Sequence, residues 1–189
     1  MKVKNILLLA AEITGNDGVK DFIKNGVASD TDTAKRDTEK LLDAYNFVNS
    51  ELAGEYEKLY IKEKAENVSE VELSALKEYP YEIVSVEGAD GFPVRFNIKD
   101  GKIALENNGT VVVFYRYIPK KKGLEDEADY GELSRITPRT LALGTAREFL
   151  FNSGAYTHAA EVDAKFKQAL NACLKPRGRR VIPQRSWFL

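Results

Sequence analysis

The hydrophobic period of this sequence changes twice, and these two changes constrain the fold more than any other feature. Up to about Lys58, apolar residues recur every three or four positions, as they do in amphipathic helices. From Leu59 to Ile118, short Val, Ile, Tyr and Phe runs are separated by turn residues, which indicates β-strands. Helical spacing resumes at Thr137. This order predicts an α+β fold, in which the N- and C-terminal helices form a helical bundle and a small antiparallel β lobe is inserted between them.

The amino-terminal part of the chain predicts a short buried helix followed by a long amphipathic one. The first is expected near 3–13, and the turn residues Gly15 to Gly18 end it. Ser29 or Asp30 can cap the second, which is expected near 31–58. Its apolar stripe consists of Ala34, Leu41, Tyr45, Val48, Leu52 and Tyr56.

The middle of the chain predicts several short strands. They are expected at Tyr60–Lys64, Val68–Leu73, Tyr81–Glu87, Pro93–Ile98, Lys102–Leu105 and Thr110–Tyr117. Asp100-Gly101 is a strong hairpin dipeptide, and Asn107-Asn108-Gly109 predicts a second hairpin.

The carboxy-terminal part predicts a helical hairpin followed by an arm. Thr137 is an N-cap residue, and Pro138 suits the first helical position because its missing N–H would have no partner there. Ser153-Gly154 separates helices expected near 137–153 and 155–174, and Pro176 ends the second. The 189 residues suit one domain, or one domain carrying an insertion. The expected organisation is a helical bundle from 1–58 and 133–175, an inserted β lobe at 59–118, a charged loop at 119–132 and an extended docking arm at 176–189.

Charge is balanced overall but uneven along the chain. The formal net charge of −1 excludes bulk attraction to nucleic acid or to an anionic membrane. The charged loop holds an acidic block: Glu125, Asp126, Glu127, Asp129 and Glu132. The arm is basic and ends in aromatic residues: Arg177, Arg179, Arg180, Arg185, Trp187 and Phe188. We expect the block to stay hydrated or to meet a basic surface, and the arm to bind a partner through its aromatic anchors. The alternative for the arm is that it folds back over its own helical hairpin.

The sequence offers no catalytic constellation. His158 is the only histidine, and Cys173, the only cysteine, lies on the apolar face of its predicted helix and is expected in the core. His158 and Glu161 have the spacing of a carboxylate metal site but lack partner ligands, so a surface pair is expected. No glycine-rich phosphate loop or dinucleotide fingerprint is present. We therefore predict no enzyme activity, no cofactor and no metal.

The apolar run Ile6–Ala11 is too short to span a bilayer, and Glu12 follows it directly. No signal peptide and no membrane association are predicted, and the protein is expected in a reducing cytoplasm.

An alternative function remains open, because the arm mixes basic and aromatic residues as single-strand nucleic-acid binders do. Such binders usually mount their aromatic residues on a sheet. Tyr115 and Tyr117 on one strand face are candidates for that platform, although we expect them to be ordinary sheet residues. A nucleic-acid-binding accessory protein is therefore the second hypothesis, and a small enzyme with an unrecognised site is the third.

The whole layout resembles the head–tail connector, or adaptor, proteins of tailed bacteriophages. In the order of its elements it is similar to the tail tubular protein A adaptors of short-tailed phages. The resemblance lies in the stripe Leu41, Leu42, Tyr45, Val48 and Leu52, in Pro80–Val86, in Val111–Tyr117 with Pro119, in Leu141–Phe149, in Ser153-Gly154, in Ala159–Asp163 and in the arm Arg177–Phe188. It implies a structural protein of the virion neck, assembled in the host cytoplasm. Such a protein forms a homo-oligomeric ring, usually dodecameric, beneath the portal, and genomic DNA passes through its channel without specific binding.

The same resemblance implies partners for the two charged segments. The arm would contact the portal protein or a neighbouring subunit. The acidic block would face the channel lumen, where it repels phosphates, or the tail proteins.

Overall fold

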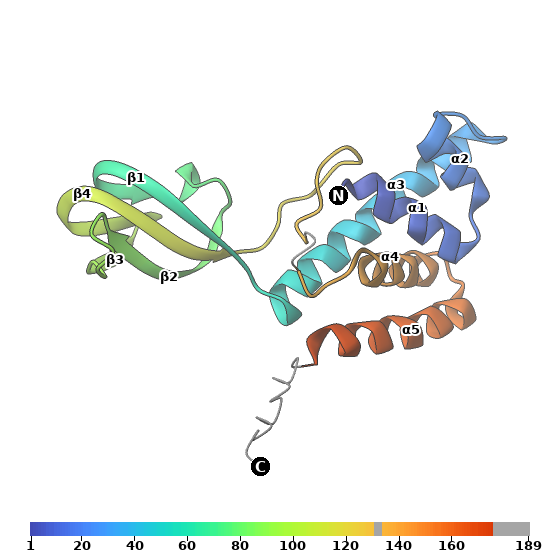
Figure 1. Ribbon diagram of the computed structural model, residues 1–189. Coiled ribbons are helices and arrows are strands. Elements are labelled where there is room, and N and C mark those ends of the chain that lie inside the picture. The colour runs from blue at the N-terminus through green and yellow to red at the C-terminus, as the bar shows by residue number, and fades with distance from the viewer. Residues whose placement is uncertain (131–133, 176–189) are drawn as a thin grey trace, which may run out of the picture.

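The computed structural model describes residues 1–130 and 134–175, so Glu132 and the arm 176–189 lie outside the described residues. The fold is α+β, as the sequence predicts. In chain order the elements are α1 (Val3–Thr14), α2 (Asp17–Asn25), α3 (Thr31–Glu51), a π-helical turn (Leu52–Tyr56), β1 (Leu59–Glu72), a 3-10 turn (Leu73–Ala75), β2 (Pro80–Gly88), β3 (Phe96–Lys99), β4 (Lys102–Tyr117), α4 (Pro138–Asn152) and α5 (Tyr156–Leu174). The bundle and the sheet occupy opposite ends of an elongated molecule (Figure 1).

The helices form where the sequence supplies caps. The side chains of Asn16, Asp30 and Thr137 accept hydrogen bonds from backbone N–H groups in the first turns of α2, α3 and α4. Gly15, with φ +69°, ends α1 in the left-handed conformation that glycine adopts without strain.

One hydrophobic core holds the bundle together. α4 lies at its centre: one side packs against α1 and α3, and α5 lies along the other (Figure 1). The core takes its largest side chains from the predicted stripe of α3 and from α1, α4 and α5, among them Ile6, Tyr45, Leu141 and Phe166. The prediction that the N- and C-terminal helices form one bundle is therefore confirmed, although Tyr56, the last residue of the predicted stripe, is 41% exposed.

The lobe is a four-stranded antiparallel sheet with its own core. β4 is the central strand: β1 pairs along one edge, and β2 and β3 pair along the other. The Asp100-Gly101 hairpin joins β3 to β4 as predicted, with positive φ at both residues. The sheet curls around Val86, Ile103, Val113 and Tyr115, which are almost fully buried.

Two strand boundaries were predicted wrongly. β1 and β4 are each continuous, and Asn107-Asn108-Gly109 makes no hairpin. Instead Gly109 pairs with Val68, while Glu70 pairs with Ala104, so β4 accommodates the extra residues as an irregularity in the ladder. The pairing of the first half of β4 with both β1 and β3 outweighs the local turn preference of the asparagines.

The long helix also ends differently from the prediction. α3 stops at Glu51, and the chain continues to Tyr56 only by changing to π geometry, in which the Glu57 N–H donates to the Leu52 carbonyl at 2.9 Å. This wider turn directs the chain out of the bundle and into β1. In the described part of the chain, no helix has the length and apolar character needed to cross a bilayer.

Candidate functional site

A groove of about 420 Å³ opens between the end of α4 and the start of α5, at the end of the bundle that lies far from the lobe. The two helices are joined by a tight turn in which Gly154 has φ +78°. This turn places Phe151 beside Tyr156, with ring centroids 5.4 Å apart and ring planes at 73°. Both rings are largely exposed, at 59% and 64%. An exposed aromatic pair at the mouth of a groove is a surface suited to binding a partner.

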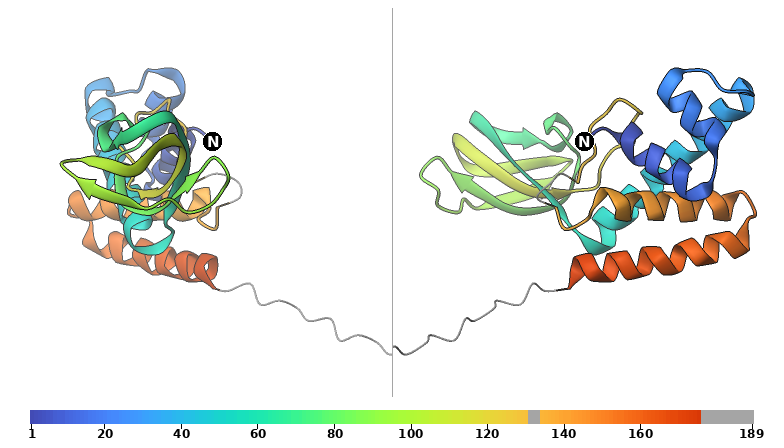
Figure 2. Two further views of the ribbon diagram at one scale, coloured as in Figure 1. Left: turned by 90° about the vertical axis from the view of Figure 1, so that its left-hand side faces the viewer. Right: turned by 45° about the vertical axis from the view of Figure 1, so that its right-hand side comes forward.

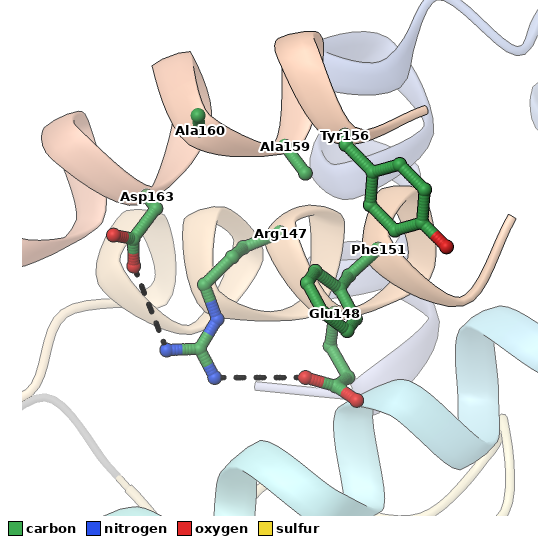
Figure 3. Close-up of a pocket in the computed structure, with 7 residues that line it drawn as sticks. All are labelled: Arg147, Glu148, Phe151, Tyr156, Ala159, Ala160 and Asp163. Carbon is green, nitrogen blue, oxygen red and sulfur yellow. Dashed lines mark ion pairs between the residues drawn. The ribbon is translucent and has the colours of Figure 1, made fainter. Parts of the chain in front are cut away.

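Arg147 lies in the groove, where Figure 3 shows it paired with Glu148 of α4 and Asp163 of α5, and it also reaches α3. Its guanidinium is 3.1 Å from Glu51 of α3, 3.7 Å from Glu148 of α4 and 3.8 Å from Asp163 of α5. It also stacks over the Phe166 ring at 4.9 Å. Asp163 also pairs with the Lys167 ammonium at 2.7 Å, so these three carboxylates face two cations and one negative charge is left over along this surface.

The surface continues onto α3. A second hollow of about 340 Å³ lies between α3 and the end of α4, beside Phe47, which is 56% exposed. Glu148 lines both hollows. Phe47, Phe151 and Tyr156 therefore belong to one helical face, and we call it the aromatic face.

The groove has the chemistry of a binding surface. Neither His158 nor Cys173 lines it, and its charged side chains are Arg147, Glu148 and Asp163. Throughout residues 1–130 and 134–175, no three His, Cys, Asp or Glu side chains gather in the manner of a metal site. The arrangement suits an occupant with apolar and cationic groups.

The acidic block divides into residues with different surroundings. Glu125 accepts hydrogen bonds from the ammonium groups of Lys2 at 2.6 Å and Lys4 at 2.9 Å, which ties the loop to the start of α1. These contacts lower the pKa of the Glu125 carboxyl to about 2, chiefly through the Lys2 hydrogen bond. Asp126 and Glu127 are exposed. Glu132 lies outside the described residues.

Asp129 points inward. Its side chain is only 7% exposed, pairs with Lys122 at 2.9 Å and accepts a hydrogen bond from the Asn49 amide at 2.9 Å. Beside it, Asn46 exchanges two hydrogen bonds with the backbone of Lys122. Asp129 therefore fastens the loop to α3 and is not presented to a lumen or a tail protein in this chain.

Tyr115 and Tyr117 are ordinary buried sheet residues, as expected, and the alternative that they form a binding platform is wrong. Both rings are buried in the lobe, at 0% and 9% exposure, and burial raises the pKa of each phenol to about 12. The period-2 alternation of β4 turns them inward, whereas Phe114 lies on the outer face. There Phe114 meets Tyr60 with ring centroids 5.3 Å apart, and the Lys62 ammonium lies 5.3 Å from its ring.

The remaining predicted residues take ordinary positions. His158 and Glu161 are exposed on α5. Cys173 is half-buried and packs against the bundle core, with its sulfur 3.5 Å from the Thr140 hydroxyl. The six predicted partner-binding residues of the arm lie outside the described residues.

Sequence reasoning missed the aromatic face. Phe47, Phe151 and Tyr156 lie outside the apolar stripes that define the core. Large aromatic residues at such positions are the sequence signal that could have revealed this face. Arg147 is an arginine within the apolar helix α4, which marks a position needing partners from other elements.

No protein-family model matches the chain, and no curated protein matches it. The function is therefore inferred from the sequence pattern and from the geometry of this molecule.

Proposed function

We propose that this protein is a head–tail adaptor of a tailed bacteriophage, a structural subunit that forms a ring beneath the portal and joins capsid to tail around the DNA channel. The proposal rests on the elongated shape of the molecule. It has two separate hydrophobic cores at opposite ends, and exposed apolar side chains lie on the surface around each core. On the bundle these are the residues of the aromatic face. On the lobe they include Tyr79, Phe92 and Ile98, exposed at 62%, 71% and 50%.

Such a plan suits a subunit that contacts several neighbours at once. In a closed ring each copy uses one surface toward the preceding subunit and a different surface toward the next. A protruding lobe adds a contact along the ring axis, toward either portal or tail. The resemblance of the sequence to phage adaptors points to the same arrangement, with the basic arm as the element that docks on the portal or on a neighbouring subunit.

The direct test measures assembly in the presence of the cognate portal. Sedimentation of the protein alone and with portal should reveal a ring species, and a low-resolution image of virions should place the protein at the neck. Deleting Ser186–Leu189 should leave the melting temperature nearly unchanged while portal binding or virion assembly fails. A protein that remains monomeric with portal and is absent from the neck would contradict the proposal.

A second candidate is an accessory protein that binds single-stranded nucleic acid. The observation that favours it is the exposed outer face of the sheet, where Tyr60 and Phe114 pack together beside Lys62. Glu87 pairs with Lys62 at 3.4 Å and Glu66 pairs with Lys64 at 2.6 Å, which weakens the attraction of this face for phosphates.

The two candidates are separated by a gel shift with labelled single-stranded DNA. Binding that is lost in Tyr60→Ser with Phe114→Ser, by a protein that ignores portal, would favour the accessory protein. Absence of a gel shift at low salt would exclude the nucleic-acid-binding accessory protein.

A further inference from the structure

We propose that the groove between α4 and α5 is the receptor for residues 176–189 of a neighbouring copy, so that the arm of each subunit fastens the next. This inference rests on the proposed ring and assigns its subunit contact.

The groove and the arm are chemically complementary. The arm holds Arg177, Arg179, Arg180 and Arg185, contains no acidic residue and ends in Trp187-Phe188-Leu189. The groove holds Glu148 and Asp163, which together with Glu51 surround Arg147, and Asp163 also pairs with Lys167 at 2.7 Å, so three carboxylates face two cations. Arginines of the arm supply the missing positive charge, since a guanidinium pairs with carboxylates through two parallel hydrogen bonds.

The aromatic ends match as well. Phe151 and Tyr156 present two largely exposed rings at the mouth of the groove (Figure 3). Indole and phenyl rings pack on such a pair edge to face or offset, and each buries roughly 150–250 Å². Trp187 and Phe188 provide rings of this kind.

The way in which α5 ends favours a neighbouring copy over the same chain. α5 starts at the groove and ends on the side of the bundle nearer the lobe, about 28 Å away for its 19 residues at 1.5 Å each (Figures 1 and 2). Lys175, the last described residue, is extended (φ −55°, ψ 129°), and the next residue is Pro176. The described chain thus leaves α5 without the left-handed reversal that a return along the same helix would need.

The reach of the arm also suits a neighbour. Trp187 follows Leu174 by 13 residues. At ~3.3 Å per extended residue these span up to ~43 Å, which is the scale of a subunit of this size. Each copy then presents a groove at one end of α5 and an arm at the other, and such head-to-tail contacts close into rings.

Peptide binding tests whether the groove is the receptor. A fluorescein-labelled peptide of residues 176–189 is titrated with full-length protein carrying Trp187→Ser and Phe188→Ser, which keeps its own arm from competing. Anisotropy should show saturable binding that weakens as salt rises. Adding Phe151→Ser and Tyr156→Ser should weaken it at least tenfold. Adding Tyr79→Ser and Phe92→Ser on the lobe, the matched control, should change it less than twofold. Equal binding to all three proteins, or none, would overturn the proposal.

Mixing tests whether the contact is made between copies. The full-length groove variant (Phe151→Ser with Tyr156→Ser) and the full-length arm variant (Trp187→Ser with Phe188→Ser) should each sediment as a monomer. Their equimolar mixture should form pairs and nothing larger, because only one intact groove and one intact arm can meet. A mixture that stays monomeric, or either variant assembling like the wild type, would overturn the proposal.

These results also separate this inference from the proposed function. If both the groove variant and the arm variant still form rings like those of the wild type, the adaptor function remains supported and the proposed contact is wrong. Specific pairs from a protein that never joins portal would leave the contact standing without the adaptor.

Discussion

Arg116 of β4 donates a hydrogen bond from Nη2 to the carbonyl oxygen of Ala53, in the π-helical turn after α3, at 3.1 Å. The same nitrogen donates to Gly54, and the guanidinium stacks on Tyr81 at 4.9 Å. Carbonyls at the end of a helix carry partial negative charge, so a cation is favourable there. Arg116 is 6% exposed and couples the orientation of the lobe to the end of the bundle's longest helix.

Replacing Arg116 with Met should destabilise the protein because it leaves two helix-end carbonyls without their donor. A loss of about 2 kcal/mol, or a fall of roughly 4–8 °C in melting temperature, is expected. Urea unfolding followed by circular dichroism gives the free energy. Arg95→Met, an exposed arginine in the same lobe, is the control and should change stability by less than about 0.5 kcal/mol. Equal effects of the two substitutions would show that Arg116 does not clamp the junction.

Gly144 marks the closest approach of three helices. A Cβ at this position would lie 2.7 Å from a Val48 methyl carbon and 2.9 Å from the Phe166 ring. Alanine normally stabilises a helix relative to glycine by about 1 kcal/mol, but forcing α3 and α5 apart costs about 1–3 kcal/mol. We expect Gly144→Ala to destabilise the protein, measured by thermal unfolding.

The control for Gly144 is Gly18 in α2. A Cβ added there would lie 3.6 Å from the Asn16 side-chain oxygen, which is an ordinary van der Waals contact. Gly18→Ala should therefore be neutral or stabilising. If both glycine-to-alanine replacements changed the stability in the same direction, the packing argument would be contradicted.

Sequence reasoning succeeds where local chemistry decides the structure. Thr137, Asp30 and the Asp100-Gly101 dipeptide specify a cap or a turn within a few residues, and each does so in the structure. It fails at Asn107-Asn108-Gly109, because strands distant in sequence pair across that segment. Local preference carries no information about such partners.

The site was harder to predict than the fold. In the sequence the acidic block is a uniform run of carboxylates. In the structure Asp129 is buried against Lys122, whereas Glu125 pairs with Lys2 at the surface. Those roles depend on which helix the loop crosses. In the groove Arg147 meets carboxylates from α3 and α5, and spacing along one helix cannot reveal those partners.

Asp129 should matter for stability more than its exposed neighbours. Asp129→Asn removes the partner of Lys122, whose side chain is 21% exposed. Breaking a fully buried pair costs about 3–5 kcal/mol, and the partial exposure of the lysine reduces the expected loss to about 1–3 kcal/mol. Asp126→Asn, in the same loop but exposed, is the control. If urea midpoints of the two variants coincide, the Asp129 pair contributes nothing to folding.

The contact of Glu125 with Lys2 and Lys4 should make stability depend on acid pH. Because the pKa of this carboxyl falls to about 2 in the folded protein, against ~4.3 for an unfolded glutamate, its stabilisation is fully present above ~4.3. The stabilisation is lost as the pH falls toward 2, where the folded carboxyl is itself protonated. Glu125→Gln should therefore melt about 1–2 °C lower than wild type at pH 7, with the gap closing between pH 5 and pH 2.

Salt and a neighbouring residue supply the controls for this prediction. The contacts are exposed, so 1 M NaCl, with a screening length of about 3 Å, should also narrow the gap at pH 7. Glu127→Gln removes the same charge from the same exposed loop, and the Glu127 side chain itself makes no ion pair with a lysine or arginine among the described residues. The melting temperature of Glu127→Gln should not differ from wild type by an amount that disappears between pH 5 and pH 2. A Glu125→Gln difference that stays constant from pH 7 to pH 2, or that grows as the pH falls, would mean that the two lysines do not hold this carboxylate in its charged form.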